Sequence, residues 1–455
     1  MSDIPFYLLS FLVVLGVLVV FHELGHYFAA RLCGVKVLRF SIGFGPVVWQ
    51  RRCGSDGTEW ALSLLPLGGY VKMLDEREAS VASEELHRAF NRQGVGRRSL
   101  IVAAGPLANF VLAIVLYWAV FLSGSEELLP VLATPPEDSP AAVAGIREGD
   151  RVLSLDGEAV ATWGDFRWSL LQKAVEQDSV ELEVVNEQRE ISRRRIELHA
   201  AGAQGWEGDA LGRLGVAFYR PAIPAVIGTV VPGGAAERFG LQVGDRIVEL
   251  EGQSIRTWRD FVIQIRDSAD KELVVVVDRR GQEFSLNLIP DSVREGGRRV
   301  GKVGVGVADD PAMHKELKVF VRYGLFAAAG KALTETWDKS VFSLVMMGKM
   351  LTGEVSLKNL SGPVTIADYA GQSAKLGLDY YLKFMALVSI SLGVLNLLPV
   401  PVLDGGHLMY HMVEVVRRRP LSERAMEIGQ RIGLAFLALL MAFAFFNDIT
   451  RLVVG

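Results

Sequence analysis

Two histidines and a glutamate lie within five residues of one another in the first apolar segment of the chain. His22 and His26 are four residues apart, so a helix places both imidazoles on one face, where they can bind the same ion at about 2.0–2.1 Å. Glu23 lies beside them without being a ligand, in position to take a proton from an attacking water. The pattern predicts a metal-dependent hydrolase.

A catalytic zinc ion usually has three protein ligands and one open position, so the two histidines need a partner. Asp404 follows a stretch that contains two prolines and ends an apolar segment, 396–405. Helix-breaking backbone at membrane depth is tolerated only where it is buried in protein or lines a wet cavity, and a carboxylate at such a break is typical of a ligand. His407 and His411 compete for the role, but they lie nearer the basic residues 417–419 and better fit an outer or interfacial position.

The setting of this motif is apolar. Half of the 455 residues are hydrophobic, and a bilayer core of roughly 30 Å needs about 20 helical residues. Four segments meet that requirement: 5–30, 100–122, 380–398 and 428–446. Three ionisable side chains inside the first of them are costly, by at least about 2.5 kcal/mol for a charged group near the bilayer centre, and such groups mark functional sites. In the alternative, the two histidines satisfy one another in a helix bundle, which leaves Glu23 unexplained.

Basic residues beside these spans predict their orientation, because they favour the cytoplasmic side. They form three clusters: 31–52, 97–98 and 417–431. We therefore expect both termini and the long stretch between the second and third spans on the opposite side. His22 lies 17 residues beyond Pro5, or about 26 Å at 1.5 Å per residue, which places the site toward the cytoplasmic end.

Net charge and cysteine content bear on the possible partners and on the possible metal ligands. The formal net charge is −4, which argues against a nucleic-acid partner, since such proteins normally carry a strong basic excess. The two cysteines, Cys33 and Cys53, leave little basis for a thiolate metal site. Any metal must be held by histidines and carboxylates.

The long stretch contains an internal repeat, because residues 145–152 match 240–247, and the match continues through 162–166 against 257–261. Each copy pairs a Gly-Asp turn with short β-branched strands and then a helix. The pattern resembles PDZ domains, whose grooves bind an extended peptide by adding it to a sheet edge. A β-rich spacer without a ligand is the alternative.

These observations predict an α-helical polytopic membrane protein with four transmembrane helices and two inserted PDZ-like α+β domains. The expected parts are spans one and two with the zinc motif, the two domains, an amphipathic stretch on the membrane surface, and spans three and four with the aspartate: 1–125, 126–215, 216–310, 311–375 and 376–455.

Three stretches together resemble the site-2 protease family of intramembrane zinc metalloproteases. They are His22–His26, Gly105-Pro106-Leu107-Ala108-Asn109 in span two, and Asn396–Gly405. The tandem repeat and the stretches 66–73 and 360–364 extend the resemblance over nearly the whole chain. Gly105, Pro106 and Asn109 would kink span two beside the site, or serve only helix packing.

The resemblance implies Zn²⁺ held by His22, His26 and Asp404, with Glu23 activating water and Asn396 holding the substrate backbone. It also implies a membrane-dipping β-hairpin from Ser41 to Leu65, which includes Gly43 and adds a strand to an unwound substrate helix. A cytoplasmic loop without substrate contact is the other interpretation of that segment.

The resemblance further implies a place in the bacterial inner membrane, in contact with its lipid, with both termini and the PDZ-like domains in the periplasm. The implied substrates are single-span proteins already trimmed there, such as an anti-sigma factor, and remnant signal peptides. We expect the PDZ-like domains to screen substrates by size or by a newly exposed C-terminus.

Two other functions fit parts of the pattern. A catalytically silent membrane scaffold that presents PDZ domains would not need His22, Glu23, His26 and Asp404. A metal transporter would repeat its polar residues across several spans, whereas here they concentrate at one depth.

Overall fold

A computed structural model describes residues 3–198, 210–295, 298–308, 317–356, 360–419 and 421–454. Within these ranges four helices are long and apolar enough to cross a membrane, which confirms the four predicted spans. They are α1 (Ile4–Leu32), α2 (Val95–Ser123), α11 (Leu378–Leu397) and α13 (Glu423–Val454). The chain is therefore a multi-pass membrane protein with inserted β domains.

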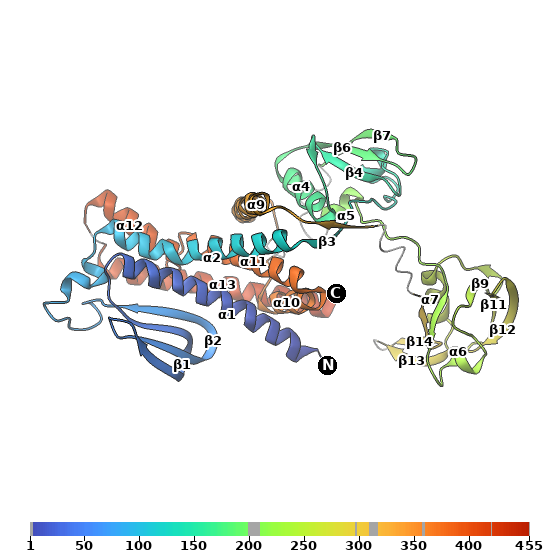
Figure 1. Ribbon diagram of the computed structural model, residues 1–455, viewed down its shortest axis with the longest axis horizontal. Helices are drawn as coiled ribbons and strands as arrows, with labels where there is room; N and C mark the ends of the chain where they lie inside the picture. The colour runs from blue at the N-terminus through green and yellow to red at the C-terminus, as the bar shows by residue number, and fades with distance from the viewer. Residues whose placement is uncertain are drawn as a thin grey trace.

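The four spans run alongside one another, with both termini at the end that faces the inserted domains (Figure 1). Helix α2 packs against both α1 and α11. A Cβ at Gly25 of α1 would lie 2.2 Å from the Ala104 carbonyl oxygen of α2, so these two helices meet backbone to backbone. Small residues permit this closeness where burial of apolar surface cannot drive helix association.

A long antiparallel hairpin follows α1 and lies along it (Figure 1). Its strands are β1 (Val37–Cys53) and β2 (Thr58–Met73), and their register is broken by several bulges. Phe40 is buried against α1, whereas Val48, Trp49 and Leu64 are each more than half exposed. Apolar side chains exposed on a hairpin beside a transmembrane helix fit contact with lipid. Two short 3₁₀ turns, η1 (Leu86–Arg88) and η2 (Phe90–Arg92), then lead into α2.

A two-stranded ribbon joins the inserted domains to the spans. Its strands, β3 (Ser125–Leu128) and β16 (Lys318–Val321), pair antiparallel, so the insertion leaves and re-enters the membrane domain at one place.

The two inserted domains share one architecture. In the first, a sheet of order β5-β4-β6-β7 packs with α3, α4 and α5. Its elements are α3 (Pro140–Val143), β4 (Arg151–Leu155), β5 (Glu158–Ala159), α4 (Trp163–Glu176), β6 (Ser179–Val185), β7 (Ile191–Glu197) and α5 (Ala210–Leu214). Val216 lies in this core and Phe218 bridges to Leu132, so the first domain continues beyond the boundary expected at residue 215.

The second domain repeats the sheet order as β10-β9-β11-β12. Its elements are β8 (Ile227–Val230), α6 (Ala235–Arg238), β9 (Arg246–Leu250), β10 (Gln253–Ser254), α7 (Trp258–Arg266), β11 (Leu273–Arg279), β12 (Gln282–Leu288), β13 (Asp291–Glu295), β14 (Arg298–Lys302) and β15 (Val305–Val307). The repeated aspartates explain the sequence match. Asp150 and Asp245 each accept a backbone N–H three residues earlier, at 2.9 and 2.8 Å, which closes the turn before a strand.

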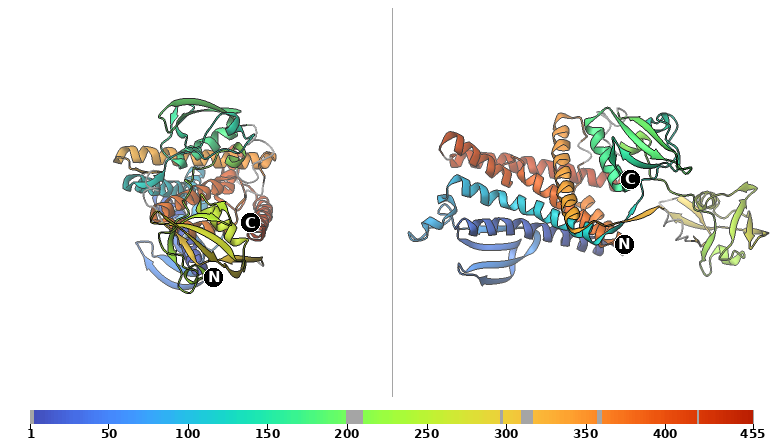
Figure 2. Two further views of the ribbon diagram at one scale, coloured as in Figure 1. Left: turned by 90° about the vertical axis from the view of Figure 1, so that its right-hand side faces the viewer. Right: turned by 45° about the horizontal axis from the view of Figure 1, so that its top comes forward.

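Helix α9 (Leu325–Thr352) runs across the spans rather than along them (Figures 1 and 2). Ala328 and Ala332 are buried, whereas Phe326 and Trp337 are largely exposed. A helix with one small-residue face on the bundle and one large apolar face free is typical of a helix lying in the membrane surface.

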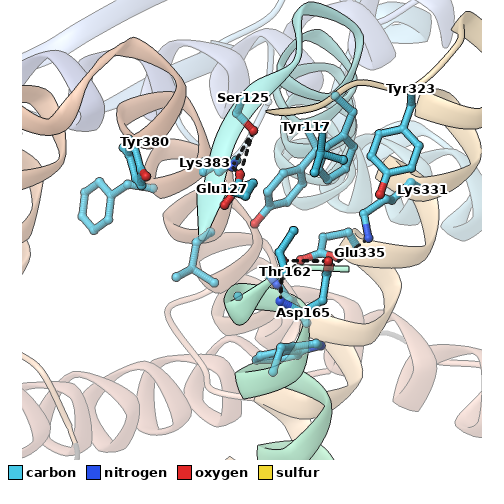
Figure 3. Close-up of a pocket in the computed structure, with 17 residues that line it drawn as sticks. Tyr117, Ser125, Glu127, Thr162, Asp165, Tyr323, Lys331, Glu335, Tyr380 and Lys383 are labelled. Atoms are coloured by element: carbon cyan, nitrogen blue, oxygen red, sulfur yellow. Dashed lines mark hydrogen bonds and ion pairs between the residues drawn. The ribbon is translucent and has the colours of Figure 1, made fainter. Parts of the chain in front are cut away.

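The first inserted domain is fastened to α9 around a cavity of about 310 Å³ (Figure 3). Lys331 donates to Asp165 of α4 at 3.0 Å, and the Lys339 ammonium lies 4.1 Å from the ring centroid of Trp168. Burial alone would lower the pKa of Lys331, but the Asp165 carboxylate holds that pKa above its usual value. Lys349 adds a hydrogen bond to the Val175 carbonyl at 3.1 Å. Charge pairing and ring contacts therefore hold this domain on the bundle.

The last elements are α10 (Pro363–Leu376) and α12 (Asp404–Arg417), the latter between α11 and α13. Asp448 of α13 accepts from the N–H groups of Gly362, Val364 and Thr365 at 2.9, 2.9 and 3.2 Å. A buried carboxylate thus satisfies the free donors at the start of α10 and ties it to the last span.

Candidate metal centre

Helix α1 brings the two histidines of the motif together. Their ring centroids are 4.8 Å apart and their Nε2 atoms 3.2 Å apart, as the four-residue spacing predicts. The side chains of His22 and His26 are 13% and 12% exposed, so both imidazoles are largely shielded from the surroundings. Glu23 is buried next to them.

Asp404 reaches the same point from the other end of the sequence. Helix α11 ends at Leu397, the two prolines interrupt the helical backbone, and α12 begins at Asp404. Added Cβ atoms at Gly405 and Gly406 would lie 2.2 and 2.3 Å from carbonyl oxygens of the preceding loop. The loop can fold back onto the first turn of α12 only because these two residues lack side chains, and this fold presents the carboxylate to α1.

The spacing of the three ligand atoms fits a zinc ion. Asp404 Oδ2 lies 3.2 Å from His22 Nε2 and 3.5 Å from His26 Nε2, and the two Nε2 atoms are 3.2 Å apart. A tetrahedral ion with ligands at 2.0–2.1 Å requires them about 3.3 Å from one another. Among the described residues, His22, His26 and Asp404 are the one group of His, Cys, Asp or Glu side chains whose ligand atoms lie close enough together to hold a metal ion.

The protonation of His26 supports the same interpretation. Its Nδ1 lies 2.8 Å from the carbonyl oxygen of Ile101 in α2. A carbonyl only accepts, so Nδ1 carries the proton and Nε2 of the neutral ring presents a lone pair. In the neutral ring that lone pair faces the Asp404 carboxylate, an arrangement that a metal ion bound between the two would stabilise.

Helix α2 forms the wall behind the histidines through three residues on one face: Ile101, Gly105 and Asn109. A Cβ at Gly105 would lie 2.3 Å from His26 Nε2 and 2.9 Å from His22 Cε1. The glycine expected to kink or pack span two therefore lies directly against both histidines.

Gly69 of β2 lies against Glu23, a contact that sequence reasoning missed. Its Cβ would lie 2.9 Å from Glu23 Cγ and 2.8 Å from the Ser41 carbonyl oxygen. A signal for this contact is the Gly68-Gly69 pair inside a strand, which is typical of a close backbone approach. The hairpin therefore reaches the acidic side chain of the motif directly.

The structure places the remaining predicted residues as follows. Gly43 lies in β1 at a φ of +88°, where the register shifts between Ile42 and Phe44. Asn396 is half-buried in the last turn of α11. His407 and His411 line a separate cavity of about 460 Å³, and Nδ1 of His411 lies 3.2 Å from the Ser99 hydroxyl.

Comparison with known proteins identifies the family. A model of peptidase family M50 matches residues 10–440. The chain belongs to peptidase family M50. The regulator of sigma-E protease RseP of Escherichia coli is 43% identical over 449 residues, which cover 98% of each chain. Protease RseP of Yersinia pestis is 42% identical, covering 99% of this chain and 100% of the relative. A Neisseria meningitidis protein named as a zinc metalloprotease is 42% identical, with 98% and 99% covered.

This M50 chain is therefore a zinc-dependent peptidase, and the resemblance found in the sequence is confirmed. The scaffold and transporter alternatives are set aside, because the match to a peptidase family covers most of the chain. It includes α1 and α12, the two helices that carry His22, His26 and Asp404.

Replacing Gly105 with alanine is expected to weaken zinc binding about 10- to 100-fold, the range for disturbed partners of metal ligands. The added methyl group cannot coexist with the present position of His26. Gly96→Ala in the first turn of α2 is the matched control, since its Cβ would meet nothing within 4 Å. Zinc affinity measured by competition with a coloured chelator distinguishes them, and equal affinities would show that α2 does not confine the ligands.

Proposed function

We propose that this M50 chain is an intramembrane zinc protease in which His22, His26 and Asp404 hold the zinc and Glu23 is the general base. The observation that carries the proposal is the triangle of ligand atoms, with sides of 3.2, 3.2 and 3.5 Å, assembled from α1 and α12. Zinc bound there would polarise the scissile carbonyl and make water a stronger acid. Glu23, buried beside the histidines, takes the proton and returns it to the leaving amine.

The hairpin positions the substrate in this proposal. A transmembrane helix protects its peptide bonds with internal hydrogen bonds, so it must unwind before hydrolysis. Strand β2 touches Glu23 through Gly69, and an extended substrate segment added along the hairpin would lie next to the general base. The bulge at Gly43 interrupts the regular β1–β2 ladder, which supports a role for that glycine in leaving backbone groups to the substrate.

Asn396 contributes a second contact to the substrate backbone. It lies in the last turn of α11, just before the loop that leads to Asp404. An amide there offers both a donor and an acceptor to an unwound peptide, close in sequence to the carboxylate ligand.

The relatives and the architecture support a substrate class. The Escherichia coli relative is named regulator of sigma-E protease RseP, which supports an anti-sigma factor as one single-span substrate, with remnant signal peptides as another. Both termini lie at the end of the spans that faces the inserted domains (Figure 1), and the basic clusters lie toward the other. A bacterial inner-membrane location with periplasmic domains satisfies this distribution and puts the zinc toward the cytoplasm.

The inserted domains, as PDZ-like modules, would screen substrates so that only a pre-trimmed protein reaches the zinc. The first domain is held on α9 by Lys331 and Asp165, and α9 crosses the spans at the end where a single-span substrate with a large outer domain must approach (Figure 2). A fixed domain at that position obstructs a bulky substrate more than a trimmed one.

The experiment that tests the proposal reconstitutes the purified chain in detergent with a trimmed single-span substrate. We expect cleavage within the membrane segment, its loss after treatment with a strong zinc chelator, and its recovery on adding zinc back. Cleavage that survives complete zinc removal would overturn the proposal, as would full zinc loading without any cleavage.

The same assay tests the screening role with an untrimmed substrate. A variant in which residues 130–316 are replaced by a short Gly-Ser turn keeps the β3–β16 ribbon closed, so the spans remain joined as they are. This variant is expected to cleave the untrimmed substrate faster than the intact chain does. An unchanged rate would remove the screening role and leave the zinc chemistry untouched.

A further inference from the structure

Asn109 faces the rear nitrogen of His22 from a wholly buried position. Its amide nitrogen Nδ2 lies 3.2 Å from His22 Nδ1, and the residue is 0% exposed. The amide oxygen Oδ1 is buried without a hydrogen-bond partner among the described residues. A buried amide oxygen without a donor loses the hydrogen bonds that water would give it, which destabilises this orientation of the side chain.

The orientation of the amide conflicts with the role of the imidazole it contacts. If Nδ2 donates to His22 Nδ1, the neutral ring must carry its proton on Nε2. That nitrogen, however, is the atom directed at Asp404 Oδ2 and His26 Nε2, at 3.2 Å from each. A protonated Nε2 cannot ligate a metal. Because the oxygen and nitrogen of an amide have nearly the same shape, the hydrogen-bond network decides between the two orientations.

We infer that Asn109 is a positioning residue for the metal centre: its Oδ1 accepts the Nδ1 proton of His22 and leaves Nε2 free for zinc. This inference rests on the proposed zinc site and adds to it the group that fixes the tautomer of one ligand. Rotating the amide by half a turn places Oδ1 against Nδ1 at the 3.2 Å now occupied by nitrogen.

His26 has the same kind of hydrogen-bond partner behind its ring. Its Nδ1 donates to the Ile101 carbonyl at 2.8 Å. Ile101 and Asn109 are eight residues apart with Gly105 midway, so they lie along one face of α2. One helix therefore supplies an acceptor to each histidine and, between them, the bare backbone that lets both rings approach. Partners of this kind orient metal-ligating histidines and raise their basicity.

A hydrogen bond from α11 holds the backbone of Asn109 in place. The Ser389 hydroxyl of α11 donates to the Asn109 backbone carbonyl at 2.8 Å. Helix α11 also leads to the loop that presents Asp404. The contact between α2 and α11 thus links the partner of the first ligand to the helix that precedes the loop before Asp404.

The test compares Asn109→Leu, which keeps the size and removes the acceptor, with Asn109→Asp, which keeps the acceptor. Zinc affinity is measured on the purified full-length chain by competition with a coloured chelator. We expect the leucine variant to bind zinc about 10- to 100-fold more weakly and the aspartate variant to stay within a few-fold of the unmodified chain. Asn447→Leu is the matched control, since Asn447 is a buried asparagine of α13 that donates to the Leu360 carbonyl.

A second measurement separates tautomer control from a general packing role. Cobalt replaces zinc, and its visible absorption reports the ligand geometry. The aspartate variant should give the spectrum of the unmodified chain and the leucine variant an altered one. Asn109→Ala takes the place of the leucine variant if the latter does not fold.

Two results would overturn the inference: unchanged zinc affinity in the leucine variant, or an aspartate variant as weak as the leucine one. Failure of the underlying zinc site would look different. In that case the unmodified chain itself would show no tight zinc that depends on His22 and His26, whatever residue stands at position 109.

Discussion

Replacing Asp404 with alanine is expected to release zinc and to reduce cleavage below detection. Loss of a partner behind a ligand already weakens metal binding about 10- to 100-fold, and Asp404 supplies one of the three atoms that form the ligand triangle. The remaining histidines would leave two positions of a tetrahedral ion to water. Zinc content of the purified variant, measured by mass spectrometry, and cleavage of a single-span substrate check both parts.

His407→Ala is the control for this substitution. His407 lies on the same helix, one turn after Asp404, and lines the separate cavity near Arg98 and Glu414. This variant should keep its zinc. If His407→Ala lost the metal while Asp404→Ala retained it, the assignment of the third ligand would be reversed.

Much of this centre could be predicted because its chemistry is local. The four-residue spacing of His22 and His26 alone places two imidazoles on one face of a helix, and the apolar run around them shows that the face lies in a membrane. Asp404 was predictable for a different reason, since two prolines in an apolar segment require a break, and a carboxylate at that break needs a partner.

Other parts of the centre depend on how distant segments pack, which no local pattern encodes. Gly105 and Asn109 fit an ordinary packing and kink motif of a membrane helix, and only the crossing of α1 and α2 shows that they lie against His26 and His22. The contact of Gly69 with Glu23 could not be predicted for the same reason. It depends on the bulged register of the hairpin rather than on the residues beside Gly69 in the sequence.

Some parts of the fold could also be predicted from the sequence and others could not. Hydropathy identified the four spans, because each must satisfy its own backbone inside lipid. The boundary between the inserted domains was less clear, because Val216 and Phe218 continue the first core after a repeat whose visible match ends much earlier. A segment that completes a domain from its far end has no sequence feature that shows which copy it belongs to.

Replacing Glu23 with glutamine is expected to reduce the turnover rate about 10²- to 10⁴-fold, the contribution of a positioned general base. Glutamine has nearly the shape of glutamate, so the contact with Gly69 and the packing of the hairpin on α1 should survive. Zinc content should therefore remain that of the unmodified chain, because Glu23 is not among the three residues proposed to hold the zinc.

The combination of retained zinc and lost turnover separates a base from a ligand, since Asp404→Ala should lose both. Binding of a trimmed single-span substrate to the Glu23→Gln variant should persist, because the hairpin surface is unchanged. Turnover within a few-fold of the unmodified chain would assign the proton transfer to another group. Loss of zinc would instead mean that Glu23 supports the metal, and the position of β2 against its side chain would then serve the centre rather than the substrate.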